Sequence, residues 1–592
     1  MVPPQHAESG SLRAPGALLV LLTVAAFANA TANGFVWLDH WQVESGGLIV
    51  RSWTELSNAL QQPLGAMPGW EGTAPYARPC VVLLLSLVHR VAGAHPAPYH
   101  LTLELIHLAN VLLVYSVLSA LRCDGTVAFL AAAVFAVHPL QTAAVSWVSG
   151  IADPLFAVFV LLALRLQLAA SGGTGRPALA RAGAVLSFTL ALGAKETAAV
   201  FPPLLAVTYL LFPAALAARG HSRPRALLRA VAPFCIVIIG AALYRIQVLH
   251  AGAFGGTFGA VPLDARLRTV PRLLVSYFTL PLRLGALTVC DDYVLSTRWD
   301  TATLLAVVAL GALAAGLIYC WRRHPLVAFG ALWMLLGLLP VLNIIPILHY
   351  RADRFFYFPL IGWSLACVAL LHGVLAAVGR SAHAPVHRLR WGATVLAAVS
   401  LLALIGLSIR RNAAFVDDQV LFASTLRVSP FCREARTALG DAYLRAGRYA
   451  DAVGEYQQAR TAQPSRVSYV VMPKVLINLG MAEIGRGEYA SAEAAFSEAH
   501  RLQPQLLHPL FGLGIANLGL GQVAAAATWL EQAYAIAPDD PDVVLNLALS
   551  YDRLGRQNEA LPLYRRYIER NPDGRARAIA ERRARALEAM QP

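Results

Sequence analysis

Long apolar runs separated by short basic loops fill the first 411 positions of the chain. A helix needs about 20 apolar residues to cross the hydrocarbon core of a bilayer, so runs near that length predict about eleven membrane spans. The expected spans are roughly residues 17–33, 100–121, 126–142, 151–170, 180–194, 197–216, 228–248, 301–320, 326–346, 355–378 and 391–409. Two further stretches, 79–93 and 273–289, are interrupted by polar residues or proline. Such interruptions suit helices at the membrane interface, and full spans are the alternative.

Arginine-rich loops predict the orientation of these spans. With the N-terminus in the cytoplasm, every second loop is basic, at Arg122, at Arg176 and Arg181, at Arg219 to Arg229, at Arg322 and Arg323, and at Arg380 to Arg390. Cytoplasmic loops carry the excess of Lys and Arg, so segments 33–99 and 249–300 are expected on the opposite side. An odd number of spans then places the C-terminus outside the cytoplasm as well.

A repeat with a fixed period begins after Arg411. Its clearest signal is a series of prolines spaced by 34, 40, 34 and 34 residues, namely Pro430, Pro464, Pro504, Pro538 and Pro572. A period of 34 is typical of the tetratricopeptide repeat (TPR), a helical hairpin that stacks into a solenoid.

Small and large residues recur in register with these prolines. The small positions are Leu439-Gly440, Leu479-Gly480, Leu513-Gly514 and Leu547-Ala548, then Ala452, Ala492, Ala526 and Ala560. The large position that follows holds Tyr456, Phe496, Leu530 and Tyr564, and the next holds Ala459, Ala499, Ala533 and Tyr567. Small residues opposite large ones let each hairpin nest on its neighbour. We therefore predict an all-α chain, with a polytopic membrane bundle at 1–411, a TPR solenoid of about four repeats at 412–573, and a basic capping helix at 574–592.

Composition narrows the function classes. Of 592 residues, 57% are hydrophobic and 14% are charged, and the mean hydropathy is +0.55, which excludes a purely soluble enzyme. The formal charge of +14 lies mostly in clusters between apolar runs, so it indicates membrane topology and not nucleic-acid binding. The seven cysteines have no paired spacing, so neither a disulfide framework nor a metal site is expected.

Polar residues gather at the non-cytoplasmic ends of the expected spans. Six segments contribute them, namely Asp39 with His40, His138, Asp153, Lys195 with Glu196, Asp291 with Asp292, and the stretch holding Asn343, His349, Arg351, Asp353 and Arg354. Ionisable groups are costly near lipid and mark functional cavities. We therefore expect a site for a substrate that has a phosphate at the surface and an apolar tail between helices.

The residue types favour group transfer from a lipid phosphate. Arg351 and Arg354 are the expected phosphate ligands, because a guanidinium grips phosphate oxygens through two donors, and Lys195 adds a point charge. Asp39, flanked by tryptophans, is placed to take a proton from an acceptor hydroxyl. The alternative for Asp39 is an idle, solvated loop residue.

Structural alternatives remain open for the other candidates. Lys195 and Glu196 are equally suited to forming an ion pair at a helix turn. Independently of that pair, the alternative for Arg351 and Arg354 is a role as interfacial anchors, and the alternative for His138, which precedes a proline, is to end a helix.

Several motifs occur in a characteristic order. They are FVWLDH (35–40), YARP (76–79), YHL with His107 (99–107), HPLQTAAVSWVSGIAD (138–153), AKETAAVFPPLL (194–205) and HYRADRFFYFPLIGW (349–363), followed by the repeats. Together they resemble the membrane glycosyltransferases of the GT-C fold, and most closely the transmembrane and tetratricopeptide-repeat protein O-mannosyltransferases with their bacterial relatives. The resemblance covers nearly the whole chain.

The resemblance implies an inverting transfer of a sugar, with mannose expected, from a polyprenyl- or dolichyl-phosphate donor to a protein hydroxyl. Asp39 takes the position of the catalytic acid on the first extracytoplasmic loop. We assign donor binding to Arg351, Arg354, Lys195 and His138, and supporting roles to His40, Arg78, Asp153, Glu196, His349 and Asp353. Three positions depart from the family pattern: Leu38 replaces the first of two acids, Ala143 a glutamate, and Ile151 an arginine.

The favoured hypothesis is an integral membrane glycosyltransferase whose repeats bind an acceptor or partner protein beside the active site, raising its effective concentration. Its ligands are membrane lipid and the lipid-linked donor, and no metal or cofactor is invoked. The alternative is a non-catalytic scaffold that organises envelope partners through its repeats, and a transporter is a weaker third hypothesis. Compact loops and high Ala and Arg usage predict a bacterial inner membrane with the repeats in the periplasm. The first apolar run is expected to be a retained span.

Overall fold

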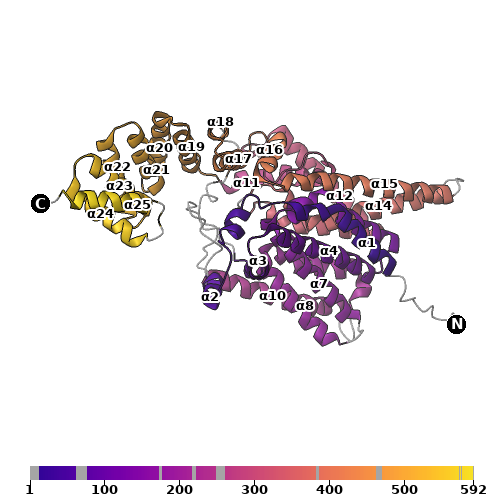
Figure 1. Cartoon of the computed structure of the whole chain (residues 1–592). Helices are drawn as coiled ribbons and strands as arrows, with labels where there is room; N and C mark the ends of the chain where they lie inside the picture. The colour runs from indigo at the N-terminus through magenta and orange to yellow at the C-terminus, as the bar shows by residue number, and fades with distance from the viewer. Residues whose placement is uncertain are drawn as a thin grey trace. The chain divides into compact units, whose positions relative to one another are not determined.

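The computed structural model describes residues 13–590 apart from 62–76, 173–175, 217–221, 248–260, 292, 348, 382–385, 462–467, 469, 572–573 and 575. The described chain is built from helices, so the predicted all-α fold is confirmed (Figure 1). It divides into two compact units, Met1–Ser429 and Pro430–Pro592.

The first unit is a bundle of apolar helices. Its helices are α1 (Arg13–Phe27), α2 (Trp53–Gln61), α3 (Pro79–Ala92), α4 (Pro96–Ala120), α5 (Gly125–Val137), α6 (Thr142–Val145), α7 (Ala152–Gly172), α8 (Pro177–Ala194), α9 (Phe201–Leu211), α10 (Arg223–Gln247), α11 (Leu263–Thr279), α12 (Thr301–Arg323), α13 (Pro325–Leu338), α14 (Pro359–Ser381), α15 (Val386–Asn412) and α16 (Asp418–Val428). Short helical turns, labelled η, join several of them.

Eight described helices are long and apolar enough to cross a membrane, or up to nine if the bent pair Gly125–Val137 and Pro139–Val145 is one span. Two of the eleven predicted spans correspond to shorter apolar helices, Glu196–Leu211 and Pro325–Val341. The interrupted stretch at 79–93 forms the short helix α3. The stretch at 273–289 instead divides between the end of α11, a 3-10 turn and irregular chain.

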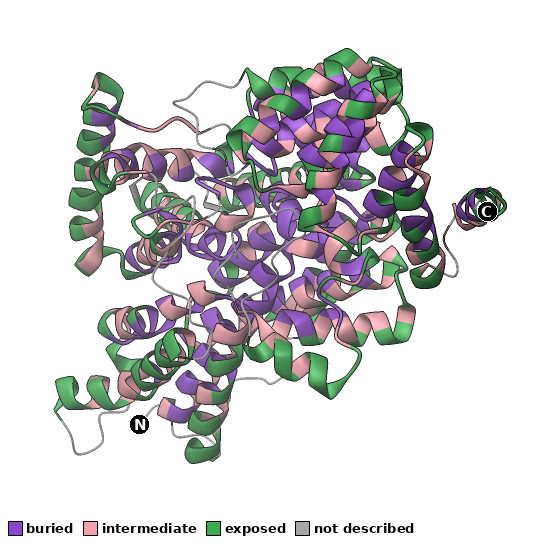
Figure 2. Cartoon of the chain, turned by 90° about the vertical axis from the view of Figure 1, so that its left-hand side faces the viewer, coloured by how far each residue is buried: buried purple, intermediate pink, exposed green. Residues whose placement is uncertain are grey.

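The outer helices expose apolar side chains, as expected of a surface that contacts lipid. Ile236 and Ile239 on α10, and Leu304 and Val308 on α12, are exposed. Figure 2 shows buried residues gathered in the interior of the bundle and exposed residues along its outer helices. An apolar outer face is favourable only where the solvent is itself apolar, so this surface supports a multi-pass membrane protein.

Two glycines bring α13 and α14 into backbone contact. A Cβ placed on Gly330 would lie 2.5 Å from the carbonyl oxygen of Gly362, and one on Gly362 would lie 2.6 Å from the backbone nitrogen of Met334. Small residues at a helix crossing allow this close approach in membrane bundles. The crossing fixes the two ends of the segment 339–358, which carries the arginines of the expected site.

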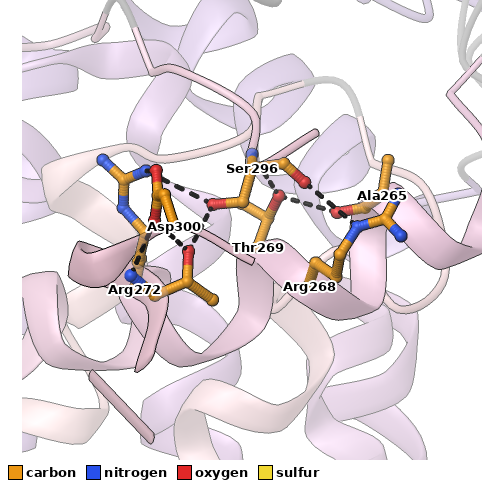
Figure 3. A network of polar contacts seen from close by, with 7 residues as sticks. Ala265, Arg268, Thr269, Arg272, Ser296 and Asp300 are labelled. Carbon is orange, nitrogen blue, oxygen red and sulfur yellow. Dashed lines mark hydrogen bonds and ion pairs between the residues drawn. The ribbon is translucent and has the colours of Figure 1, made fainter. Parts of the chain in front are cut away.

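A polar network joins α11 to the start of α12 (Figure 3). The backbone nitrogen of Ser296 donates to Oγ1 of Thr269 at 3.0 Å, and Arg272 contacts both Oγ of Ser296 and Oδ2 of Asp300. Asp300 also caps α12 by accepting from the backbone nitrogen of Thr303 at 2.8 Å. These bonds anchor α11, whose buried face recurs at Ala265, Thr269, Leu273 and Tyr277.

The second unit consists of four helical hairpins and a final helix. The hairpins are α17 (Arg433–Arg445) with α18 (Tyr449–Arg460), α19 (Met472–Arg486) with α20 (Tyr489–Leu502), α21 (Leu507–Gly519) with α22 (Val523–Ile536), and α23 (Pro541–Arg553) with α24 (Gln557–Arg570). The last helix, α25 (Arg577–Glu588), buries Ala580, Ala584 and Leu587 against α24. The TPR solenoid predicted from the period of 34 residues is confirmed, although Pro464 and Pro572 lie outside the described residues.

The small–large register of the repeats has a direct structural cause. A Cβ on Gly440 would lie 2.6 Å from Cε1 of Tyr456, and the same distance separates a Cβ on Gly480 from Cζ of Phe496. The partner alanines that follow, from Ala452 to Ala560, are fully buried. Larger residues at these positions would push the two helices of each hairpin apart.

The compact membrane unit extends beyond the boundary drawn at residue 411. Helix α16, at residues 418–428, belongs to the first unit, which ends at Ser429. Its side chains Leu421 and Phe422 are buried, and the ring of Phe422 lies 5.6 Å from that of Trp37 in the first loop.

Candidate active site

Asp39 is the most enclosed acid of the first loop. It precedes the short π-helical turn His40–Glu44 and is 0% exposed. Its Oδ1 accepts hydrogen bonds from the backbone nitrogen of Ser149 at 2.7 Å and from its Oγ at 2.5 Å, and Oδ2 accepts from the backbone nitrogen of Val36 at 3.1 Å. The carboxylate is thus held by donors from two separate segments and is not solvated.

Burial determines the protonation of this acid. It raises the pKa of Asp39 from 3.8 to about 7, although the hydrogen bonds from Ser149 and Val36 and the charge of His40 act in the opposite direction. Near neutral pH the side chain therefore populates both protonation states. A carboxylate with a pKa near the working pH is well suited to accepting a proton from a hydroxyl.

An aromatic stack covers the acid's neighbourhood. The rings of Trp37 and Trp147 lie 5.0 Å apart and nearly parallel, at 14°. The Arg354 guanidinium lies 5.1 Å from the ring centroid of Trp147 and 4.9 Å from that of Phe355. His349 meets the edge of Trp37 at 5.9 Å. The stack therefore connects the loop of Asp39 with the arginine predicted to bind phosphate.

Two further cations, Lys195 and Arg78, lie near Arg354. Nζ of Lys195 is 5.2 Å from the ring centroid of Phe355 and 2.5 Å from Oδ1 of Asp153. Lys195 is close enough to Arg78 and Arg354 for their charges to act on it. Arg354, Lys195 and Arg78 thus form a positively charged group, and a group of this kind suits an anion.

Two of these cations have carboxylate partners, but these are not the Lys195–Glu196 pair that the structural alternative predicted. Lys195 pairs with Asp153, not with its neighbour Glu196, and Arg78 pairs with Glu196 at 3.3 Å. A bound phosphate would share these cations with Asp153 and Glu196, or would displace the two carboxylates from them.

His349 is held by Arg354. Nη2 of Arg354 lies 3.2 Å from Nδ1 of His349, so it donates to a neutral ring. Burial, and then the charges of Arg354 and Lys195, lower the pKa of His349 well below its ordinary value. His349 therefore adds no charge to the group at neutral pH, and it orients the guanidinium.

Arg351 and Asp353 have structural partners away from this group. Arg351 forms an ion pair with Asp291, which also accepts from Oγ of Ser429 at 2.9 Å. Oδ2 of Asp353 accepts from the backbone nitrogen of Thr288 at 2.6 Å. Burial raises the pKa of Asp353 to about 6. Both residues tie the segment 349–356 to the loop before α12.

His138 also has structural partners. Its Nε2 lies 3.1 Å from the carbonyl oxygen of Pro281, and its Nδ1 accepts from the backbone nitrogen of Leu140 at 3.2 Å. Both ring nitrogens are therefore used by backbone groups. The alternative in which His138 ends a helix fits these contacts better than donor binding does.

Sequence reasoning missed three polar residues that hold the site. Ser149 binds Asp39, and Asn412 and Asp418 bind the first loop from positions almost 400 residues away. A hydroxyl and an amide in apolar surroundings were the available signals, but neither has a recognisable local spacing. Two of the family departures, Ala143 and Ile151, are buried in the same region.

An open apolar groove lies between α3 and α7. Its volume is about 270 Å³, and its lining residues are Cys80, Leu83, Leu84 and Leu87 of α3 with Leu155 and Phe159 of α7. Cys80 and Leu155 follow Arg78 and Asp153 by two residues each. Among the described residues, no three His, Cys, Asp or Glu side chains are grouped to hold a metal ion.

The fold and the site define a polytopic helical membrane protein that carries a TPR solenoid and a buried acid connected by stacked tryptophans to a group of cations. Comparison with known proteins agrees with this class. Models of the tetratricopeptide repeat match residues 420–467 and 477–541, and another matches residues 517–582. Among solved structures, the TPR protein YrrB matches with a TM-score of 0.25 and 18% sequence identity. The match covers 32% of this chain and 88% of the YrrB chain.

Curated relatives extend the similarity into the membrane unit. Protein O-mannosyl-transferase TMTC3 of Mus musculus is 25% identical over 94% of this chain and 60% of its own length. Protein O-mannosyl-transferase TMTC1 of Homo sapiens is 26% identical over 66% of this chain and 48% of its own. This chain thus spans about half to three-fifths of these two relatives. The resemblance to the transmembrane and tetratricopeptide-repeat O-mannosyltransferases is confirmed.

Proposed function

We propose that this chain is an integral membrane glycosyltransferase that moves a sugar, with mannose expected, from a polyprenyl-phosphate donor to a Ser or Thr hydroxyl of a protein on the non-cytoplasmic face. The observation that carries the proposal is the geometry of Asp39. It is an acid without solvent exposure, with a pKa raised to about 7, and it is connected through stacked tryptophans to Arg354. The names of the similar proteins support the same class of reaction.

In the proposed reaction the acceptor oxygen forms a bond to the anomeric carbon as the bond from that carbon to the phosphate oxygen breaks. Asp39 takes the hydroxyl proton, and the polyprenyl phosphate leaves with the electron pair of the broken bond. Positive groups placed where charge develops stabilise such a leaving group. Arg354, Lys195 and Arg78 supply that charge, and no metal or cofactor is required by this scheme.

The apolar groove between α3 and α7 supports a lipid-linked donor. A phosphate at the charged group would place the first isoprene units against Leu83, Leu87 and Phe159, which offer no polar contact. A tail that already lies in the bilayer gains no hydrophobic free energy in the groove, so these side chains orient the donor by packing and take no part in the chemistry. We propose that the repeats bind the acceptor or a partner protein, and that they lie in the periplasm of a bacterium whose inner membrane holds the bundle.

The second candidate function is a non-catalytic scaffold. The three departures from the family pattern, at Leu38, Ala143 and Ile151, favour it. A scaffold would tolerate loss of the acid and of the arginine, because neither residue contacts a partner protein in that role. A transferase would not.

The test compares purified full-length protein with the Asp39→Asn and Arg354→Gln variants, using labelled polyprenyl-phosphate mannose and an envelope-protein extract. We expect Asp39→Asn to lower kcat by about 10²- to 10⁴-fold, which is the usual contribution of a general base. Arg354→Gln should chiefly raise the KM for the donor. Asp417→Asn is the matched control, because Asp417 is exposed and caps α16 through Val420, and Asn also caps helices well.

Equal labelling by the wild type and Asp39→Asn would exclude Asp39 as the base. Absence of label in all proteins, with this donor and with other lipid-phosphate sugars, would favour the scaffold. A reporter fused after Pro538 tests sidedness, and activity there only in the cytoplasm would contradict the periplasmic assignment.

A further inference from the structure

The segment after the last span is bonded along the loop that carries Asp39. Nδ2 of Asn29 donates to the carbonyl oxygen of Ile409 at 3.0 Å, and the backbone nitrogen of Gly34 donates to the carbonyl oxygen of Val416 at 3.1 Å. These residues are about 380 positions apart in the chain. A Cβ on Gly34 would lie 2.9 Å from that Val416 oxygen, so the two backbones are in direct contact.

Asn412 connects this contact with the second segment that holds Asp39. Its Nδ2 donates to the carbonyl oxygen of Ala26 at 2.8 Å and to Oδ1 of Asn29 at 2.9 Å. Its Oδ1 accepts from Oγ of Ser146 at 2.8 Å, three residues before Ser149. Asn412 is fully buried, so it joins the first loop to the 146–149 segment in an environment without competing water.

Asp418 completes the contact next to the acid itself. Its Oδ1 accepts from the backbone nitrogen of Trp37 at 2.6 Å, and its Oδ2 lies 3.2 Å from Nε2 of His40. Trp37 and His40 are on either side of Asp39 in sequence. Asp418 is 7% exposed, and buried carboxyl groups are retained where they are hydrogen-bonded.

The backbone of Trp37 needs such a bond. Its φ is +54°, in the left-handed region that bulky residues rarely adopt. Conformations of this kind persist only where the surroundings hold them in place. Release of Trp37 would move its ring from Trp147 and turn the chain that leads to Asp39 two residues later.

We propose that Asp418 is a positioning residue for Asp39. It fixes the left-handed Trp37 and, through His40, the start of the turn after the acid, while Ser149 fixes the carboxylate from the other side. The role assigned to Asp39 rests on the proposed function, but the bonds that fix the loop do not. Helix α16 is thereby part of the catalytic unit, although it leads directly into the repeats.

The experiment uses full-length protein in detergent with three variants, Asp418→Ala, Asp418→Asn and the control Asp417→Asn. The first readout is hydrogen exchange of peptides covering residues 35–44, which does not depend on activity. Exchange should be faster in Asp418→Ala and close to wild type in Asp418→Asn, because the amide oxygen of Asn still accepts from Trp37. Asp417→Asn should leave it unchanged.

The second readout is mannose transfer. A misplacement of about 1 Å in a site costs about 10²-fold, so kcat of Asp418→Ala should fall by about 10- to 100-fold. The KM for the donor should change less than kcat, because the three cations themselves are not substituted. Asp418→Asn should restore most of kcat. A purely structural role would lower the amount of folded protein and leave kcat per folded molecule unchanged.

Unchanged exchange at residues 35–44 in Asp418→Ala would overturn the proposal. Faster exchange with normal kcat would overturn it as well, because the bond would then fix the loop without acting on the reaction. Absence of transfer by the wild type would contradict the proposed function alone. In that case the exchange comparison still decides whether Asp418 fixes the loop.

Discussion

The repeats and the site of the membrane unit are stabilised over very different distances along the chain. In the repeats, Gly440 packs on Tyr456 and Gly480 on Phe496, sixteen residues away in each case. In the membrane unit, Ser149 reaches Asp39 across 110 positions and Asp418 reaches Trp37 across 381. The repeats use the same contact several times, whereas each contact of the site occurs once.

This difference predicts that the repeats tolerate a single substitution better than the site does. A solenoid is stabilised by the sum of similar neighbour contacts, so loss of one weakens it by a limited amount. The site depends on single bonds between distant segments, and no other bond of the same kind replaces them. Equivalent substitutions in the two units should therefore differ in how much stability they remove and in how many segments they affect.

The largest expected effect comes from Asn412→Ala, compared with Asn517→Ala in the repeats. The side chain of Asn412 bonds two distant segments, at Ala26 with Asn29 and at Ser146, whereas that of Asn517 bonds only Glu493 and Leu513 nearby. A buried partner left without its bond costs about 1–3 kcal/mol, so Asn412→Ala should destabilise the membrane unit by several kcal/mol and abolish transfer. Asn517→Ala should cost about 1–3 kcal/mol in the solenoid and leave kcat unchanged.

Thermal unfolding in detergent and single-turnover transfer measure these two variants. Equal losses of stability and activity in both would contradict the comparison. Such a result would mean that loss of a buried amide alone determines the destabilisation, and that the distance along the chain to its bonded partners does not.

Gly480→Leu should have the next largest effect, confined to the repeats. The new side chain would meet the ring of Phe496, since even a Cβ would lie 2.6 Å from Cζ. Overpacking typically costs about 1–3 kcal/mol. We expect a lower unfolding temperature of the solenoid with normal donor binding, and Gly454→Leu is the control because a Cβ there meets nothing within 4 Å.

Ser149→Ala should shift the pH dependence of transfer. A base of pKa about 7 loses its carboxylate form as the pH falls, so kcat of the wild type should decline below pH 7 by tenfold per unit. Ser149 lowers the pKa of Asp39 through its hydroxyl, so its removal should raise that pKa further. The acid limb should move upward by about one unit, the equivalent of about 1.4 kcal/mol. A downward shift would contradict this assignment.

Arg583→Ala should have the smallest effect. Arg583 grips Asp552 through both carboxylate oxygens at 2.6 and 2.7 Å, but the arginine is about half exposed. Exposed pairs contribute about 1 kcal/mol or less. The ion pair lowers the pKa of Asp552, so its contribution is present above the ordinary value of 3.8 and disappears as the pH falls. Unfolding of the solenoid at pH 7 and near pH 3 measures it, and a larger difference at pH 3 would contradict this interpretation.

Much of the fold was predictable because it follows local rules. The length of an apolar run limits whether a helix can cross a bilayer, and the period of 34 residues defines the hairpins. The span count was less certain, because Glu196–Leu211 and Pro325–Val341 are shorter than a full crossing. Helix α16 was assigned with the repeats because composition changes at Arg411, yet its packing places it with the bundle.

The site was predictable only in part. Charge and position selected Asp39, Arg354 and Lys195, since ionisable residues near lipid are rare, and the structure connects the three through aromatic rings. The same rule selected Arg351 and His138, whose partners are Asp291 and the backbone. The residue type shows that an ionisable side chain near lipid costs free energy, but it does not show which group the side chain will bond.

The sequence by itself determined the helices and the repeat, because the length of an apolar run and the spacing of residue types act over neighbouring stretches of the chain. Only the tertiary structure decided that Ser149 holds Asp39 and that Asp418 holds Trp37. These bonds join segments 110 and 381 positions apart, and no local pattern encodes them. The physical reason is that a buried polar group must find a partner wherever packing places one, and packing is a property of the whole bundle.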